Sequence, residues 1–220
     1  MNSILKGLQA FARHSESRLA ITYRRIRSTR VDPNHDQRAF LFEYFGRGSV
    51  GAEIGVHRGQ FSAALVRALN PQRLYLIDPW RFVSSEKYAT ALYGRRGGRA
   101  QKNMDRRYAA VLRRFSENIE NGQAIVIRAT SNDACSAIPD GTLDWVYIDG
   151  DHSYDAVLND LRSYLPKLRL GGIMAGDDFG ETQWFGSDVV RAVHDFTEEG
   201  GAELVEVRRE QFVLRRPSGR

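Results

Sequence analysis

Acidic and imidazole side chains follow two neighbouring apolar runs of this sequence. Residues 149–152 read Asp-Gly-Asp-His and end the first run, and Asp177 with Asp178 ends the next. In an open α/β sheet, ligands bind in the crevice outside the carboxyl ends of the strands. Because so much negative charge at one point is costly unless a cation shares it, these residues predict a metal-assisted enzyme rather than a plain binding module.

The same residues also have a plainer interpretation. Asp149 and Asp151 would both suit the cap of a helix that begins near residue 153, and a lone histidine such as His152 is usually an ordinary hydrogen-bonding residue. Asp177 and Asp178 have no such capping role at their strand end. The convergence of the two groups therefore favours a metal site.

A regular alternation of strands and helices is expected to position these groups. Residues 49–54, a periodic segment 60–69 and residues 74–77 form a β-α-β unit. Crossover helices between such strands imply a mostly parallel sheet. The final strands, 203–207 and 211–215, are joined by a tight turn and are expected to be antiparallel. The remaining expected elements are strands 124–127, 143–148 and 172–175 and helices 131–137, 154–168 and 187–199.

Two segments lie outside this alternation. Residues 1–45 have the pattern of a helix, a basic loop and a helix, and are expected to form an N-terminal helical extension of a domain that spans 46–220. Residues 81–102 combine several glycines with charged residues, a composition that favours a loop. Since this loop follows the second strand, it is either a lid-like insertion over the site or a surface excursion.

Composition limits the class of protein. The chain has 220 residues, of which 42% are hydrophobic, and this suits one soluble domain with a sizeable core. The single cysteine, Cys135, excludes an internal disulfide and predicts a reducing compartment. No segment approaches the roughly 18 apolar residues of a membrane helix. A cytoplasmic protein without membrane contact is expected.

The net charge of +5 is distributed unevenly. Arginines are concentrated between residues 95 and 114 and between 24 and 30. Such a cluster is typical either of a solvated helix face or of a surface that attracts a polyanion such as RNA. Because no aromatic RNA-binding signature accompanies the arginines, the solvated face is favoured and no nucleic-acid partner is expected.

A glycine-containing segment between the first strand and the first helix indicates a nucleotide-like ligand. Residues 53–59 read Glu-Ile-Gly-Val-His-Arg-Gly, and glycines let the backbone approach a ligand closely. Asp78 ends the second strand, where a carboxylate can accept both hydroxyls of a ribose. The motif is looser than the dinucleotide fingerprint, so it indicates a ribose-bearing cofactor without naming a dinucleotide.

With these motifs, residues 45–216 resemble the class I S-adenosylmethionine-dependent methyltransferases. The resemblance implies a Rossmann-like α/β fold with a mostly parallel seven-stranded sheet, an antiparallel last strand and helices on both faces. Glu53 either contacts the cofactor or supports the turn, and Trp80 either stacks near the adenosine or is simple packing. The implied cofactor contacts are Glu53, Gly55, Val56, Gly59, Asp78, Trp80, Ser131, Asn132, Asp133 and Asp149.

The acidic residues narrow the resemblance to the metal-dependent sugar O-methyltransferases of macrolide and aminocoumarin biosynthesis. It implies that Asp149, Asp177 and Asp178 bind one divalent cation. Hard oxygen ligands favour Mg²⁺, with Mn²⁺ or Ca²⁺ as substitutes. His152 stands where the macrolide-sugar branch has its general base. Asp151 is the alternative base, as in the aminocoumarin-sugar branch, or orients His152.

The leading hypothesis is therefore a Mg²⁺-dependent O-methyltransferase that acts on a sugar hydroxyl of a glycoside, an oligosaccharide such as a mannoside, or a glycosylated natural product. A catechol-type phenolic O-methyltransferase is the nearest alternative. An RNA-binding methyltransferase and a cofactor-binding scaffold without turnover are the others. Apolar residues between 11 and 23 are expected to pack across a two-fold axis and make a homodimer.

Overall fold

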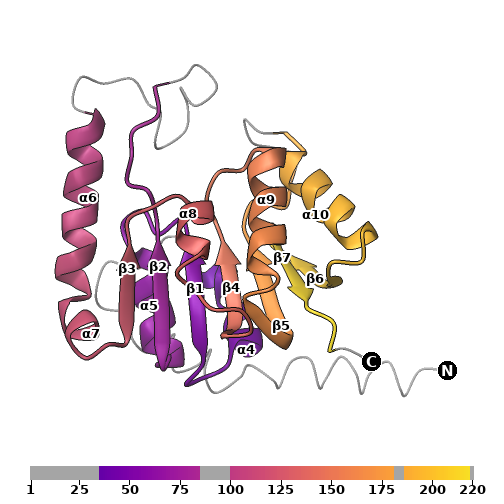
Figure 1. Ribbon diagram of the computed structural model, residues 1–220, viewed down its shortest axis with the longest axis horizontal. Helices are drawn as coiled ribbons and strands as arrows, with labels where there is room; N and C mark the ends of the chain where they lie inside the picture. Colours follow the sequence, from indigo (N-terminus) through magenta and orange to yellow (C-terminus); the bar gives the residue numbers. More distant parts are fainter. Residues whose placement is uncertain (1–34, 85–99, 181–185, 219–220) are drawn as a thin grey trace.

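A single seven-stranded sheet organises the protein. The computed structural model describes residues 35–84, 100–180 and 186–218, and the strands run in the order β3-β2-β1-β4-β5-β7-β6 (Figure 1). β1 to β5 are parallel to one another, and β7 is antiparallel to both β5 and β6. This arrangement confirms the expected fold class. The strands are β1 (Val50–Ile54), β2 (Arg73–Ile77), β3 (Ala124–Ile127), β4 (Leu143–Ile148), β5 (Leu168–Gly176), β6 (Glu203–Arg208) and β7 (Gln211–Arg215).

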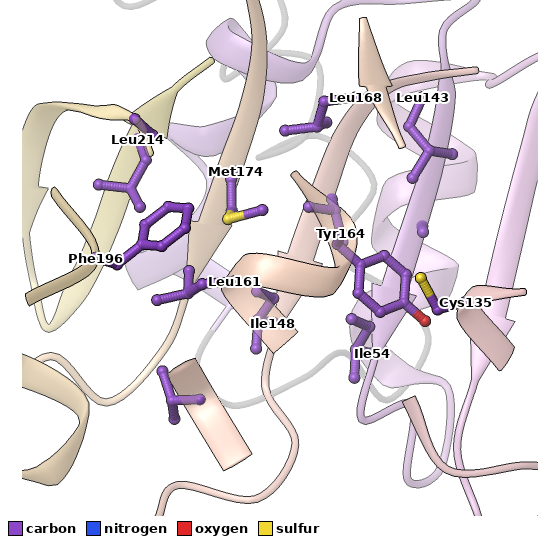
Figure 2. Packing of buried hydrophobic residues seen from close by; sticks show 14 of the residues in the cluster. Ile54, Cys135, Leu143, Ile148, Leu161, Tyr164, Leu168, Met174, Phe196 and Leu214 are labelled. Carbon is purple, nitrogen blue, oxygen red and sulfur yellow. The ribbon is translucent and has the colours of Figure 1, made fainter. Parts of the chain in front are cut away.

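Helices α8 (Ser131–Cys135), α9 (Tyr154–Tyr164) and α10 (Asp188–Glu198) cover one face of the sheet. Figure 2 shows the core beneath them, where Leu161, Tyr164 and Phe196 pack against strand residues such as Ile148 and Met174. Three of the expected helices match these elements. The helix expected over residues 154–168 is α9, which ends at Tyr164 because Pro166 cannot continue a helix.

The opposite face is covered by α4 (Leu41–Phe45), α5 (Gln60–Leu69) and α6 (Ala100–Arg114). Trp145 and Tyr147 of β4 point into this second core, where Phe45 stacks on Trp145. Two short helices, α3 (His35–Arg38) and α7 (Ser116–Glu120), complete the described elements. α6 begins at Ala100, so the last three residues of the predicted insertion 81–102 are helical.

Part of the expected N-terminal extension belongs to the core of the domain, since Leu41, Phe42 and Phe45 are fully buried against the sheet. The residues expected to make a dimer, between 11 and 23, lie outside the described residues, as do residues 85–99 of the expected insertion. Within the described ranges, no helix has both the length and the apolar character needed to cross a bilayer.

Candidate active site

The loop between β1 and α5 depends on glycines at two positions. Gly55 has a φ of 91°, a left-handed conformation that side chains disfavour, and a Cβ added to it would lie 1.7 Å from the carbonyl oxygen of Asp149. Gly59 precedes α5 with a φ of 68°, and a Cβ there would lie 2.7 Å from the ring of Phe115. The loop is thus in direct contact with the end of β4.

The other predicted loop contacts, Glu53 and Val56, have buried side chains. Glu53 belongs to β1, whose residues are all buried. Its role in supporting the turn stays a prediction. Direct contact of Glu53 or Val56 with a cofactor stays a prediction.

Asp78 ties the glycine loop to the segment after β2. One carboxylate oxygen accepts the backbone N–H of His57 at 2.8 Å, and the other accepts that of Trp80 at 2.7 Å. The residue is only 1% exposed. Asp78 therefore fixes the shape of the cofactor loop in this structure, and its contact with a ribose stays a prediction.

Trp80 is completely buried and holds the same loop from the other side. Its indole nitrogen donates to the carbonyl oxygen of His57 at 2.9 Å, and its ring packs on Tyr108 of α6 at 5.0 Å between centroids. These contacts are the packing role expected as an alternative, and stacking on adenosine stays a prediction. Burial lowers the pKa of His57 to about 4, with Arg107 and Arg58 adding to the effect, so this imidazole is neutral at pH 7.

The three residues predicted to flank the adenine form the first turn of α8. Thr130 caps this helix, because its hydroxyl oxygen accepts the backbone N–H of Asp133 at 3.3 Å. A cavity of about 550 Å³ opens at the carboxyl ends of β2 and β3 beside this turn. Asp133 lines it, whereas Ser131 and Asn132 do not. The lining residues are Pro79, Arg81, Gln101, Arg128, Ala129, Thr130 and Asp133.

The carboxyl ends of β4 and β5 bring the predicted metal ligands together. Ile148 pairs with Gly176 in the sheet, so Asp149 and Asp177 follow neighbouring positions of adjacent strands. Single ligand atoms of Asp149, His152 and Asp178 lie within 4.8 Å of one another. The Nε2 atom of His152 is 3.3 Å from a carboxylate oxygen of Asp178. Asp149 and Asp178 therefore converge with His152, whereas Asp177, the third predicted metal ligand, and Asp151, the alternative base, are not part of this cluster.

Arg38 of α3 enters this acidic group, a contact that sequence reasoning missed. Its Nη2 atom lies 3.1 Å from Oδ2 of Asp149 and also pairs with Oδ2 of Asp177. The guanidinium lies 5.2 Å from the ring centre of Phe61 and 5.5 Å from that of Tyr147, which are cation–π distances. One arginine in a basic segment carries no signal of its own, so only the fold reveals this contact.

Gln211 of β7 is the second residue that the sequence did not reveal. Its amide nitrogen donates to Oδ1 of Asp177, and its amide oxygen accepts the hydroxyl of Tyr147 at 2.8 Å. The backbone N–H of Asp178 donates to the same Oδ1 of Asp177 at 2.9 Å. Asp177 is therefore held by the antiparallel strand, by its neighbour in sequence and by Arg38.

Among the described residues, the three carboxyl groups of the acidic group lie beside one guanidinium, that of Arg38, and the imidazole of His152. Burial raises the pKa of Asp149 well above its ordinary value, with Arg38 opposing the shift and Asp177 and Asp178 adding to it. Burial also raises the pKa of Asp178, although His152 opposes that shift. One guanidinium cannot balance these three carboxylates. A divalent cation, which prefers carboxylate oxygen, fits this donor set.

Asp151 lies at the start of α9 and has an exposed side chain. Its Oδ1 accepts the backbone N–H of Ser153 at 3.0 Å. This contact is a local turn just before α9, whose N-cap residue is Ser153 without a side-chain capping hydrogen bond, so it is not the helix cap expected as the plainer alternative. The role of Asp151 as the base, or in orienting His152, stays a prediction.

Asp160 of α9 is a buried carboxyl beneath the site that no sequence pattern singled out. It is hydrogen-bonded to Ser131, and Oδ2 would lie 3.9 Å from a Cβ added to Gly150. Burial raises its pKa from the ordinary 3.8 to about 7, and the hydrogen bond from Ser131 opposes the shift. Asp160 thus connects the helix beside the cavity with the loop that carries Asp149 and His152.

Comparisons with known proteins agree with this fold. The model of the family described as "Methyltransferase domain" matches residues 52–179, which is more than half of the chain. The chain therefore belongs to this methyltransferase domain family, and it has the fold of S-adenosylmethionine-dependent methyltransferases. A search of curated proteins finds no significant match.

Solved structures with the same fold have low sequence identity to the chain. A protein from Corynebacterium glutamicum is 13% identical, with 99% of each chain covered and a TM-score of 0.60. The N-methyltransferase NodS from Bradyrhizobium japonicum is 16% identical, with 84% of this chain and 94% of that chain covered and a TM-score of 0.55. An S-adenosylmethionine-dependent methyltransferase from Aquifex aeolicus is 15% identical, with 84% and 92% covered and a TM-score of 0.53. At these identities the likeness shows the fold alone.

Proposed function

We propose that this methyltransferase transfers the methyl group of S-adenosylmethionine to a sugar hydroxyl with the help of Mg²⁺, which Mn²⁺ or Ca²⁺ can replace. We divide the site into a cofactor half, the glycine loop of residues 53–59 with Asp78, and an acidic half, formed by Asp149, Asp177 and Asp178 with His152. The observation that carries the proposal is the contact between these two halves. A Cβ on Gly55 would lie 1.7 Å from the carbonyl oxygen of Asp149, so the cofactor loop touches the residue that begins the acidic group. A methyl donor bound at the glycine loop and a methyl acceptor bound at the acidic group would therefore be neighbours.

Asp149, Asp177 and Asp178 are the residues that would hold the metal. Their carboxylates share one edge of the sheet, and the negative charge there exceeds the charge of Arg38. When bound, a divalent cation supplies Lewis-acid polarisation of the acceptor hydroxyl, which lowers the pKa of that hydroxyl. This chemistry is needed because an alcohol is too weakly acidic to attack a methyl group quickly in its neutral form.

His152 is the residue that we assign as general base. Its side chain is partly exposed, so an acceptor can reach it, and its Nε2 atom lies 3.3 Å from Asp178. That carboxylate can orient the ring and stabilise the imidazolium that forms when the ring takes up the acceptor proton. Asp151 is the alternative base, although its Oδ1 accepts the backbone N–H of Ser153 in the turn before α9.

The cofactor would lie across the glycine loop and the ends of β2 and β3. Gly55 and Gly59 let the backbone approach it, and the rigid Asp78 contacts hold the loop in place. The cavity of about 550 Å³ beside α8 is large enough for an adenine and borders Asp133. The acceptor would then approach from the side of His152, as a small molecule or an oligosaccharide rather than a nucleic acid.

The experiment that tests the proposal measures methyl transfer from labelled S-adenosylmethionine to a panel of glycosides, mannosides and catechols. We expect turnover of a sugar acceptor that stops with EDTA and returns with Mg²⁺. Asp149→Asn should lower turnover at least about 10²-fold, since it removes a metal ligand. Asp140→Asn is the matched control, because Asp140 is exposed and pairs only with Lys167 among the contacts seen for it.

The acceptor panel separates the alternatives. If only catechols are methylated, the acceptor is a phenol and not a sugar, and the metal-assisted mechanism still holds. Turnover that persists in EDTA, with full activity of Asp149→Asn, would contradict the metal-assisted mechanism. Steeply salt-dependent RNA binding together with methylation of RNA would replace the small acceptor by a nucleic acid.

A further inference from the structure

A single nitrogen atom of Arg38 joins the ends of two strands. Nη2 pairs with Oδ2 of Asp149, at 3.1 Å, and with Oδ2 of Asp177. These oxygens belong to two of the three residues that would hold the metal. A positive group bound by both oxygens occupies the position that a cation shared by the same oxygens would take.

The surroundings of Arg38 form a site for a guanidinium. The residue is 8% exposed, and its charged group lies over the rings of Phe61 and Tyr147. Gln211 and the backbone of Asp178 hold the other oxygen of Asp177, so the carboxylate is kept in line with the guanidinium. The arginine is thus a fully enclosed counter-cation of the acidic group.

Two cations cannot share this position. A divalent ion such as Mg²⁺ binds carboxylate oxygens at about 2.1 Å, which is shorter than any hydrogen bond to nitrogen. The ion and the guanidinium would then be two positive charges close together in a buried position, where their repulsion is strong. One of the two has to leave the oxygens when the other arrives.

We propose that Arg38 competes with the divalent cation for Asp149 and Asp177, so that metal binding expels the guanidinium and releases α3 from the site. This inference rests on the metal in the proposed function. α4 follows α3 after two residues and is buried in the core through Leu41, Phe42 and Phe45. The movement is therefore limited to α3 and the Arg38 side chain, and α4 remains in place.

The direct test measures Mn²⁺ binding to the full chain by calorimetry and by electron paramagnetic resonance. Arg38→Gln removes the competing charge and should bind Mn²⁺ about tenfold more tightly than the wild type. Arg47→Gln is the matched control, because Arg47 is exposed and its side chain donates to the carbonyl oxygen of Ala68, away from the acidic group. It should bind Mn²⁺ as the wild type does. Equal or weaker binding by Arg38→Gln overturns the inference.

Hydrogen exchange of the wild type gives a second measurement that needs no variant. Addition of Mn²⁺ should increase the rate of amide exchange in peptides that contain α3, while the rates in peptides from α9 stay the same. Unchanged or slower exchange at α3 with Mn²⁺ bound overturns the inference and leaves the proposed metal intact. If neither the wild type nor Arg38→Gln binds Mn²⁺ at millimolar concentration, the metal of the proposed function is wrong, and the inference is lost with it.

Discussion

The two halves of the site are stabilised in different ways. In the cofactor half, the charge of Asp78 is met by the backbone N–H groups of His57 and Trp80, which belong to the fold itself. In the acidic half, Asp149 and Asp177 pair with the guanidinium of Arg38, and Asp178 lies beside His152. The first half is therefore complete once the chain has folded, whereas in the second a guanidinium holds carboxylates that, in our proposal, a divalent cation would bind in its place.

The contrast has a physical cause. Backbone amides are dipoles that come with the chain and carry no net charge, so they stabilise a buried carboxylate without adding a counter-ion. Carboxylates at adjacent strand ends repel one another, and burial strengthens the repulsion. Burial is the main cause of the raised pKa values of Asp149 and Asp178, and the neighbouring carboxylates add to both shifts. We expect substitutions in the acidic half to affect catalysis and those in the cofactor half to affect folding and cofactor binding.

The largest expected effect is on the acidic half. His152→Ala should lower kcat by about 10²- to 10⁴-fold, because it removes the proposed proton acceptor. The limb of the pH–rate profile that a general base produces should disappear. His194→Ala, in which an exposed histidine of α10 is lost, is the control and should keep its rate. If His152→Ala keeps that limb and Asp151→Asn loses it, the base is Asp151.

The contact between the two halves gives the second prediction. Gly55→Ala should lower the free energy of unfolding by roughly 4 kcal/mol, since the new Cβ would overlap the carbonyl oxygen of Asp149 at a left-handed φ. Gly122→Ala has a similar φ of 76° but nothing near its Cβ, and should cost only about 1 kcal/mol. Urea unfolding measures both. Equal losses would mean that backbone strain, and not the contact, decides the effect.

Asp160 gives a pH-dependent prediction. Its pKa in the folded state, about 7, lies above the ordinary 3.8, so the folded state binds more protons between these values and stability falls as pH rises through them. Asp160→Asn should therefore stabilise the protein by roughly 3 kcal/mol at pH 8 and hardly at all at pH 4. Thermal or urea unfolding at both pH values measures the difference. A stabilisation that is the same at pH 4 and pH 8 would exclude ionisation of Asp160 as its cause.

The smallest expected effect concerns the cofactor half. Trp80→Phe removes the hydrogen bond to the carbonyl oxygen of His57 and should cost about 1 kcal/mol of stability. It should also weaken S-adenosylmethionine binding several-fold, because the loop loses a tether. Tyr44→Phe removes one hydrogen bond to Glu206 outside the site and is the matched control. If calorimetric titration finds the same affinity for S-adenosylmethionine in both variants, the Trp80 hydrogen bond does not contribute to cofactor binding.

The fold was largely predictable because buried parallel strands are continuous apolar runs. β4 spans the same residues, 143–148, as the expected strand, and α5 the same residues, 60–69, as the expected helix. β5 begins at Leu168, four residues before the expected strand, because its first residues include exposed Arg169 and Leu170 and do not form an apolar run.

The site was predictable only where its residues follow strand ends. Asp149, His152 and Asp178 come next to apolar runs, so their convergence could be inferred from the sheet. Arg38 and Gln211 reach the same place from 139 and 34 residues away from Asp177 in the chain. Nothing local marks such residues, since their role comes from tertiary packing. The turn contact of Asp151 with Ser153 precedes α9 and differs from the helix cap that the sequence suggested as one alternative.

The position of β7 has a consequence for the order in which the site is made. β7 lies between β5 and β6, and it contributes Gln211, which holds Asp177. During synthesis the residues of the cofactor loop leave the ribosome well before this strand does, so the carboxylates proposed to bind the metal acquire this partner later. A nascent chain can therefore shape its donor-binding loop early, while its acidic group acquires its full set of partners only after the C-terminal hairpin has inserted into the sheet.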